Sequence, residues 1–181
     1  MTREEALALV EESLSEENLR KHVLATEAVM RALARRLGGD EDSWGLAGLL
    51  HDIDYEETKD DPDRHAVVGA EKLRSLGIAD DIVEAVLAHN DKAPRAKPMA
   101  SALTCADPVT GFIVAVALVR PDKKLSSVTL KSVKKRWKEK RFAAGASREG
   151  MAVCSEIGLE RDEFLGVALE AMQGIAPALG L

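Results

Sequence analysis

The sequence predicts an all-α protein that forms a single domain. Of its 181 residues, 46% are apolar, which is enough for a folded core. Ala, Leu, Glu, Lys and Arg, all good helix formers, dominate the composition, whereas strand-type segments are few. A chain of this length normally forms one domain. We therefore expect a helical core over residues about 15–119, followed by a helical extension over about 120–181.

Capping residues and helical periodicity give the helices of the core. Thr2 and Glu5 form a capping box for the first helix, and Gly38–Gly39 ends the second. A polar loop that contains proline is expected over Asp54–Asp63. The predicted helices before and after this loop are, in order, about Thr2–Ser13, Glu17–Leu37, Ser43–Asp52, Arg64–Gly77 and Ala79–His89.

The sixth predicted helix carries Leu103, Asp107 and an apolar run to Val119. Pro108 should kink or break it, because proline lacks a backbone N–H and clashes with the preceding turn. The extension is expected to hold a loop and then three helical segments, which are about Val128–Glu139, Ser147–Ile157 and Arg161–Leu179.

The net charge of −6 conceals an uneven distribution. Residues 120–148 contain 11 Lys and Arg against two Asp and Glu, so the rest of the chain is strongly acidic. One cationic segment on an acidic body argues against binding of a nucleic-acid polymer and is compatible with one small anionic molecule.

No segment resembles a secretory signal or a membrane span. The N-terminus, MTREEALALVEE, is acidic and amphipathic. The longest unbroken apolar run, Phe112–Val119, is far shorter than the ~20 residues that cross a bilayer. We therefore expect a cytoplasmic protein without a membrane partner.

Candidate metal ligands lie at the end of the third predicted helix. Leu46–Glu56, LAGLLHDIDYE, is an apolar run that delivers the pair His51–Asp52. Imidazole binds Fe, Mn, Co, Ni or Zn as a neutral donor, and a carboxylate can bridge two cations. A His-Asp pair alone is common, so its significance depends on the three other histidines, His22, His65 and His89.

A later aspartate strengthens the case for a metal site. Asp107 lies within the apolar segment ALTCADPVTGFIV, and a carboxylate buried on such a helix needs a cation or a full set of hydrogen bonds. A single histidine is more often a hydrogen-bonded imidazole of the core or the surface. Four histidines at helix ends or on helix faces, together with Asp52 and Asp107, favour a metal site instead.

The order His22, His51–Asp52 and Asp107 resembles the four-residue signature of the HD superfamily of metal-dependent phosphohydrolases. His65, in RHAVVGA, and His89, in AVLAHN, match the two further histidines of members that hold two metals. The chain looks most similar to small bacterial HDIG-type proteins, including those that hydrolyse dinucleoside polyphosphates. The resemblance implies the helical bundle of an HD domain.

This resemblance covers residues about 18–119 and implies a role for each matched residue. It implies two divalent transition-metal ions (Fe, Mn, Co, Ni or Zn), of which the first would be held by His22, His51, Asp52 and Asp107. Asp52 would bridge to the second ion, held also by His65 and His89. Two bridged ions activate a hydroxide and neutralise charge on a phosphoryl oxygen.

The chain departs from the family pattern directly after the His-Asp pair. Many relatives have glycine and then lysine after His-Asp-Ile, where this chain has Asp54 and Tyr55. A lysine able to neutralise phosphate is therefore absent there. We interpret Asp54 as a possible proton acceptor in catalysis, beside the bridging Asp52.

The basic segment offers replacements for that lysine. Trp137 or Phe142 could stack on a nucleobase, and basic side chains could bind phosphate. The candidate substrate contacts are Arg120, Lys123, Lys131, Lys135, Arg141 and Arg148, with Lys134 and Lys138 beside them. The alternative interpretation of these charges is a solvated helix face.

These observations favour a dinuclear metal-dependent phosphohydrolase. It would use a metal-activated hydroxide on a phosphate ester or anhydride of a nucleotide or of another small phosphorylated metabolite. The alternative is a mixed-valent di-iron oxygenase of the HD fold that cleaves a C–C or C–P bond, because the same ligands suit iron. A third interpretation is a ligand sensor without turnover.

Overall fold

The computed structural model describes residues 1–181 and contains helices but no strands, which confirms the all-α prediction. The α-helices are α1 Arg3–Ser13, α2 Glu17–Leu37, α3 Glu41–Leu50, α4 Tyr55–Thr58, α5 Val67–Ser75, α6 Asp80–His89, α7 Pro98–Leu118, α8 Leu130–Trp137, α9 Arg148–Ala152, α10 Arg161–Gly174 and α11 Ala176–Leu179. Two 3₁₀ turns, η1 Leu125–Ser127 and η2 Val153–Ile157, lie in the C-terminal part.

Local capping chemistry explains the ends of the first helices. Thr2 forms the predicted capping box with Glu5, and Gly38 ends α2 in the left-handed conformation at φ 75°. Asp40 accepts a hydrogen bond from the backbone N–H of Ser43, so α3 begins two residues earlier than predicted, at Glu41.

Two element boundaries differ from prediction in the region around the loop. The predicted loop over Asp54–Asp63 contains the short helix α4. The next helix, α5, begins at Val67 and not near Arg64, because Ala66 adopts the left-handed conformation at φ 67° and cannot belong to a right-handed helix. His65 therefore lies in the turn that precedes α5.

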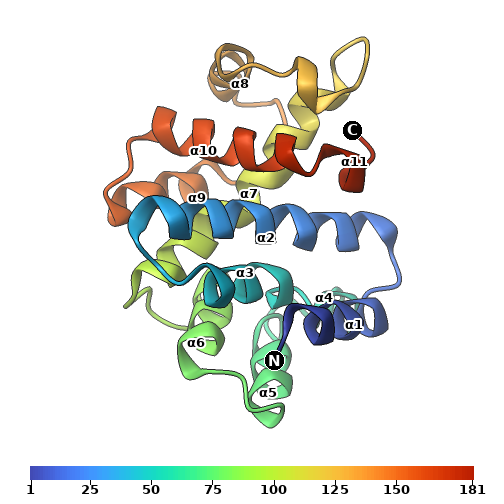
Figure 1. Ribbon diagram of the computed structural model, residues 1–181, viewed down its shortest axis with the longest axis vertical. Helices are drawn as coiled ribbons and strands as arrows, with labels where there is room; N and C mark the ends of the chain where they lie inside the picture. The colour runs from blue at the N-terminus through green and yellow to red at the C-terminus, as the bar shows by residue number, and fades with distance from the viewer.

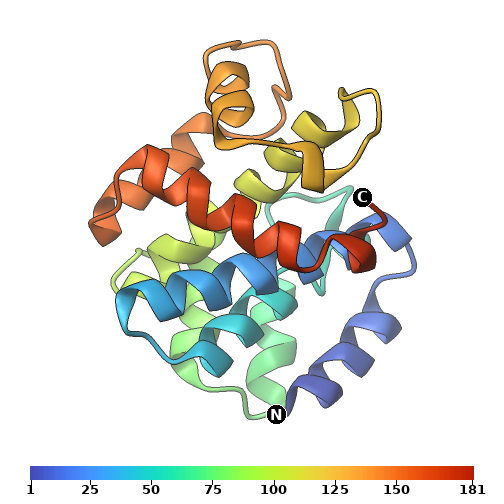
Figure 2. The same cartoon turned by 45° about the horizontal axis from the view of Figure 1, so that its top comes forward.

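The long helices α2 and α7 form the centre of the molecule. In Figure 1, α2 lies between α10 on one side and α3 on the other, and α7 crosses behind it. The view of Figure 2 shows the same stacking of α10, α2 and α3. The apolar core is continuous across residue 120, because Phe164 and Leu165 of α10 belong to the same buried cluster as Val29 of α2 and Phe112 of α7.

The predicted break at Pro108 does not occur. One helix, α7, runs from Pro98 to Leu118 with Pro108 in its interior. Proline removes one backbone hydrogen bond there, but most of α7 is buried and its apolar contacts outweigh that loss. By length and hydropathy α7 is the one helix that would pass for a membrane span, and 61% of its apolar window is buried inside the fold.

A glycine permits the close approach of α2 and α3. A Cβ atom at Gly48 would lie 2.8 Å from the backbone oxygen of Thr26 and 2.9 Å from the backbone nitrogen of Glu27. These are backbone atoms of α2, which cannot rotate away. Gly48 therefore sets the distance between the two helices, and near this contact the Nε2 atoms of His22 and His51 lie 3.2 Å apart.

We expect Gly48→Ala to destabilise the protein by about 1–3 kcal/mol, because the added methyl group forces α2 and α3 apart. Gly111→Ala is the matched control within a helix, since a Cβ at Gly111 meets nothing within 4 Å and alanine favours helices. Urea denaturation of both variants measures the difference. Equal stability of Gly48→Ala and the parent protein would contradict the close helix contact.

Candidate metal centre

The six residues predicted to bind metal lie in one cluster, although five different elements and turns carry them. They are His22 in α2, His51 and Asp52 at the end of α3, His65 before α5, His89 at the end of α6 and Asp107 in the middle of α7. His51 and Asp52 are buried, and His89 has only 3% of its side chain exposed. His22 and Asp107 are the more open members, at 22% and 36%.

The first group of donors surrounds one small space. The Nε2 atoms of His22 and His51 lie 3.2 Å apart, and the Nε2 of His22 lies 3.1 Å from Oδ1 of Asp107. Oδ2 of Asp52 lies 3.4 Å from the Nε2 of His51 and 3.5 Å from that of His22. Ligand atoms about 2.1 Å from a shared ion are separated by roughly 3.0–3.5 Å, so these separations fit one cation.

The second group lies on the other side of Asp52. Its Oδ1 lies 3.4 Å from the Nε2 of His65 and 3.6 Å from the Nε2 of His89. The two oxygens of one carboxylate thus face two different sets of imidazole nitrogens. This arrangement fits a carboxylate that bridges two cations.

Backbone carbonyl groups orient two of the imidazoles. The Nδ1 of His51 donates to the carbonyl of Gly48 at 2.9 Å, and the Nδ1 of His89 donates to the carbonyl of Val86 at 2.5 Å. Each proton on Nδ1 leaves the Nε2 lone pair free toward the cluster, which is the tautomer that a metal requires.

Thr110 orients His22 in the same way. Its hydroxyl group donates to the backbone carbonyl of Asp107 at 2.9 Å and therefore accepts from the Nδ1 of His22 at 3.0 Å. The sequence analysis missed Thr110, whose partner His22 lies 88 residues away in the chain. Asn90 was missed too, and its amide group donates to the backbone carbonyl of His65 at 3.2 Å.

Asp54, which the sequence analysis interpreted as a proton acceptor, contacts His65 and the backbone of α5. The residue is fully buried, and its Oδ1 accepts from the Nδ1 of His65 at 2.9 Å. Its Oδ2 accepts from the backbone N–H of Gly69 at 2.7 Å. Because its oxygens are engaged by the Nδ1 edge of His65 and by the backbone, and not by the Nε2 side that faces Asp52, Asp54 is not arranged to accept a proton from a reacting water. The geometry assigns it to the orientation of His65.

Burial and neighbouring charges shift the pKa values of these groups. Burial lowers the pKa of His51 to about 4, so its imidazole is neutral at physiological pH. Burial also acts to lower the pKa of His65, but hydrogen bonds to Asp52 and Asp54 outweigh it and raise the value to about 9. Burial alone would raise the pKa of Asp52, yet the surrounding imidazoles hold it well below its ordinary value.

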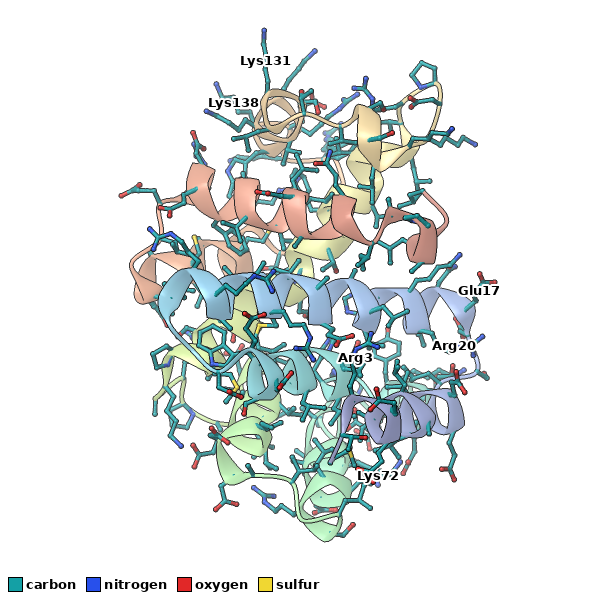
Figure 3. The ribbon with its side chains drawn as sticks, in the orientation of Figure 1. Arg3, Glu17, Arg20, Lys72, Lys131 and Lys138 are labelled. Atoms are coloured by element: carbon teal, nitrogen blue, oxygen red, sulfur yellow. The ribbon has the colours of Figure 1, made fainter.

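The predicted substrate contacts on α8 lie apart from the centre. Lys131 and Lys138 extend outward from the end of the molecule in Figure 3. Together with Lys135 they line a shallow surface groove that includes none of the six clustered residues. Arg141 is exposed beyond the end of the same helix.

The remaining basic candidates are engaged in local structure. Arg120 donates from Nε to the hydroxyl of Ser127 at 2.5 Å, and Lys123 lies in a left-handed turn at φ 51°. Arg148 donates to three backbone carbonyl groups, those of Phe142, Ala143 and Ala146. It thereby holds the loop before α9.

The aromatic side chains predicted to stack on a base pack into the core instead. The ring centroid of Phe112 lies 6.0 Å from that of Trp137 and 5.8 Å from that of Phe142, edge to face in both cases. These ring contacts therefore pack α8 and the loop that follows it against α7.

We expect Asp54→Ala to weaken metal binding by about 10–100-fold, and more at the His65 side than at the His22 side, because only His65 loses its partner. Metal content after dialysis, measured by mass spectrometry, should fall from two ions toward one. Asp61→Ala, at an exposed aspartate without an ion pair, is the control. Two retained ions in Asp54→Ala would contradict the role of Asp54.

Metal binding should depend on pH through His65. Its pKa near 9 means that the metal-free protein carries a proton there at neutral pH, and an ion must displace it. Between pH 6 and 8, apparent affinity at this side should therefore rise by at least about tenfold per pH unit, because, against the effect of burial, Asp52 also raises the pKa of His89, the other imidazole on this side. His51 adds no such dependence, because it is already neutral in this range. Calorimetric titration with Mn²⁺ at several pH values measures the slope, and a flat profile would contradict it.

Comparisons with known proteins agree with this geometry. Residues 19–140, more than half of the chain, match the HD domain family, and the matched range contains all six clustered residues. Ribonuclease Y of Oleidesulfovibrio alaskensis is 33% identical over 95 residues, which are 52% of this chain and 18% of that protein. Ribonuclease Y of Nitratidesulfovibrio vulgaris is 32% identical over 95 residues, again 52% and 18% of the two chains.

A third ribonuclease Y, from Fervidobacterium nodosum, is 30% identical over 94 residues, 52% of this chain and 18% of its own. The match thus spans less than a fifth of the length of these relatives. The family match and the cluster of histidines and aspartates agree. The chain belongs to the HD domain family, whose members are largely metal-dependent phosphohydrolases.

Proposed function

We propose that this protein hydrolyses a phosphate ester or anhydride of a small phosphorylated metabolite with two divalent transition-metal ions. The observation that carries the proposal is the position of Asp52, whose two oxygens face separate groups of imidazole nitrogens. Nitrogen and oxygen donors of this kind suit Fe, Mn, Co, Ni or Zn.

The ligands divide between the two ions by which oxygen of Asp52 they face. His22, His51 and Asp107 would hold one ion with Oδ2, and His65 and His89 would hold the other with Oδ1. When bound, such a pair lowers the pKa of water and neutralises charge on a phosphoryl group.

The protein contributes orientation and controlled access. Thr110 and Asp54 fix the rings of His22 and His65, so the donors are arranged before a substrate arrives. His51 and His89 close the inner side of the cluster, whereas Asp107 remains partly exposed. We infer that the substrate approaches from the side of Asp107.

We propose a small substrate and not an RNA chain. The relatives are named as ribonucleases, but this chain covers only 18% of their length. The unpaired lysines of α8 line a groove apart from the candidate ligands, so they form no basic track into the centre. Binding of a polymer would depend on such a track of phosphate contacts.

The proposal predicts release of inorganic phosphate by protein loaded with Mn²⁺, Fe²⁺, Co²⁺ or Ni²⁺ in a screen of phosphorylated metabolites. Asp52→Asn should lower the rate by more than about 100-fold, because the amide cannot bridge two cations as a carboxylate does. Asp60→Asn is the control, since Asp60 is exposed and lies outside the cluster.

Two outcomes would contradict the proposal. One is a full load of two ions without phosphate release from any compound in the screen. The other is oxygen uptake by the iron-loaded protein with a substrate, because hydrolysis needs no O₂, and that result would favour the oxygenase alternative.

A further inference from the structure

A cavity of about 430 Å³ opens beside the candidate metal centre. His89 and Asp107 line it on the side of the centre, and Ser147 and Glu149 line it from the segment around the start of α9. Cavities of this size are typical of sites for small molecules. Asp107 belongs both to this cavity and to the metal centre. A molecule that reaches the centre through the cavity therefore contacts the C-terminal extension, which supplies Ser147 and Glu149.

A second cavity of about 420 Å³ also touches the cluster, at His22. Thr110 also lines this second cavity and accepts from the Nδ1 of His22, on the edge of the ring that faces away from the other donors. Its walls include Leu118 and Leu179, so it is more apolar. The cavity at Asp107 is therefore the better candidate for a polar substrate.

The lining of the Asp107 cavity offers both donors and acceptors of hydrogen bonds. The hydroxyl of Ser147 accepts from the backbone N–H of Gly150 at 2.9 Å and keeps its own proton to donate. The hydroxyl of Thr104 donates to the carbonyl of Ala100 at 2.9 Å and keeps a lone pair to accept. Glu149 is exposed and forms no ion pair, so its carboxylate is free to accept.

The charges of this cavity disfavour a second phosphate group. Arg95 is its only cation, and its guanidinium group already binds Asp91 at 3.2 Å and Glu156 at 3.2 Å. Glu149, which is not a candidate ligand, adds further negative charge. A nucleoside diphosphate or triphosphate would therefore meet carboxylates where its additional phosphates need cations.

The cavity also lacks a platform for a nucleobase. Stacking requires the flat face of an aromatic ring, and no Phe, Tyr or Trp lines the cavity. Phe142 and Trp137 are packed against Phe112. Carboxylates and hydroxyl groups without aromatic rings suit a compound rich in hydroxyl groups.

We propose that this cavity binds the hydroxyl-rich part of a sugar or polyol monophosphate, and that Glu149 and Ser147 of the extension select it. The inference rests on the proposed function, since the phosphate group would lie at the metal centre. The loop before α9 holds these two residues in place, because Arg148 ties it through three backbone carbonyl groups. Specificity would thus come from the extension and chemistry from the core.

The test compares substrates in the full-length, metal-loaded protein. Glucose 6-phosphate or glycerol 3-phosphate should be hydrolysed with a higher kcat/KM than AMP or phenyl phosphate. In Glu149→Gln, the ratio of kcat/KM for glucose 6-phosphate to that for phenyl phosphate should fall by about tenfold, because phenyl phosphate has no hydroxyl group to bind. Glu12→Gln, at an exposed glutamate of α1 outside both cavities, is the matched control and should keep the ratio.

A binding measurement separates this inference from the proposed function. If no compound is hydrolysed, the proposed function fails, and calorimetric titration with glucose 6-phosphate decides the inference. Binding that Glu149→Gln weakens by about tenfold supports it. Preference for AMP, an unchanged ratio in Glu149→Gln, or no binding of glucose 6-phosphate overturns it.

Discussion

The carboxylate of Asp52 is the constraint on which the rest of the structure depends. It is almost fully buried and lies within 3.6 Å of imidazole nitrogens on both of its oxygens. A buried carboxylate is costly unless cations or hydrogen bonds offset its charge. The packing of α2, α3, α6 and α7 brings the imidazoles that offset this charge around Asp52. The absence of a side chain at Gly48 lets α3 come close enough to α2 for His51 to face His22.

A shell of fixed partners turns this cluster into an ordered set of donors. Carbonyl groups of the helices that carry His51 and His89 orient their rings, so the helix ends themselves decide the tautomer. Asp54 and Thr110 do the same for His65 and His22 from other elements. Asp54 thus fixes one candidate ligand, and the extension supplies polar side chains on the open side of the centre.

The sequence predicted the helix ends that nearby capping residues determine. The capping box at Thr2 marks the start of α1 and Gly38 marks the end of α2, because the partners of these caps lie within a few positions. The break that Pro108 was expected to cause, if not a kink, does not occur, because burial of most of α7 decides its continuity. The partners of His65 and His22 escaped prediction, since Asp54 lies 11 residues and Thr110 lies 88 residues away in the chain, and only the fold brings them near.

The central claim is that two cations share Asp52. Anomalous diffraction from crystals soaked in Mn²⁺ tests it most directly, because the signal locates each ion without reference to activity. We expect two peaks, one between Oδ2 of Asp52 and the nitrogens of His22 and His51, and one between Oδ1 and the nitrogens of His65 and His89. A single peak, or peaks that do not contact Asp52, would contradict the account.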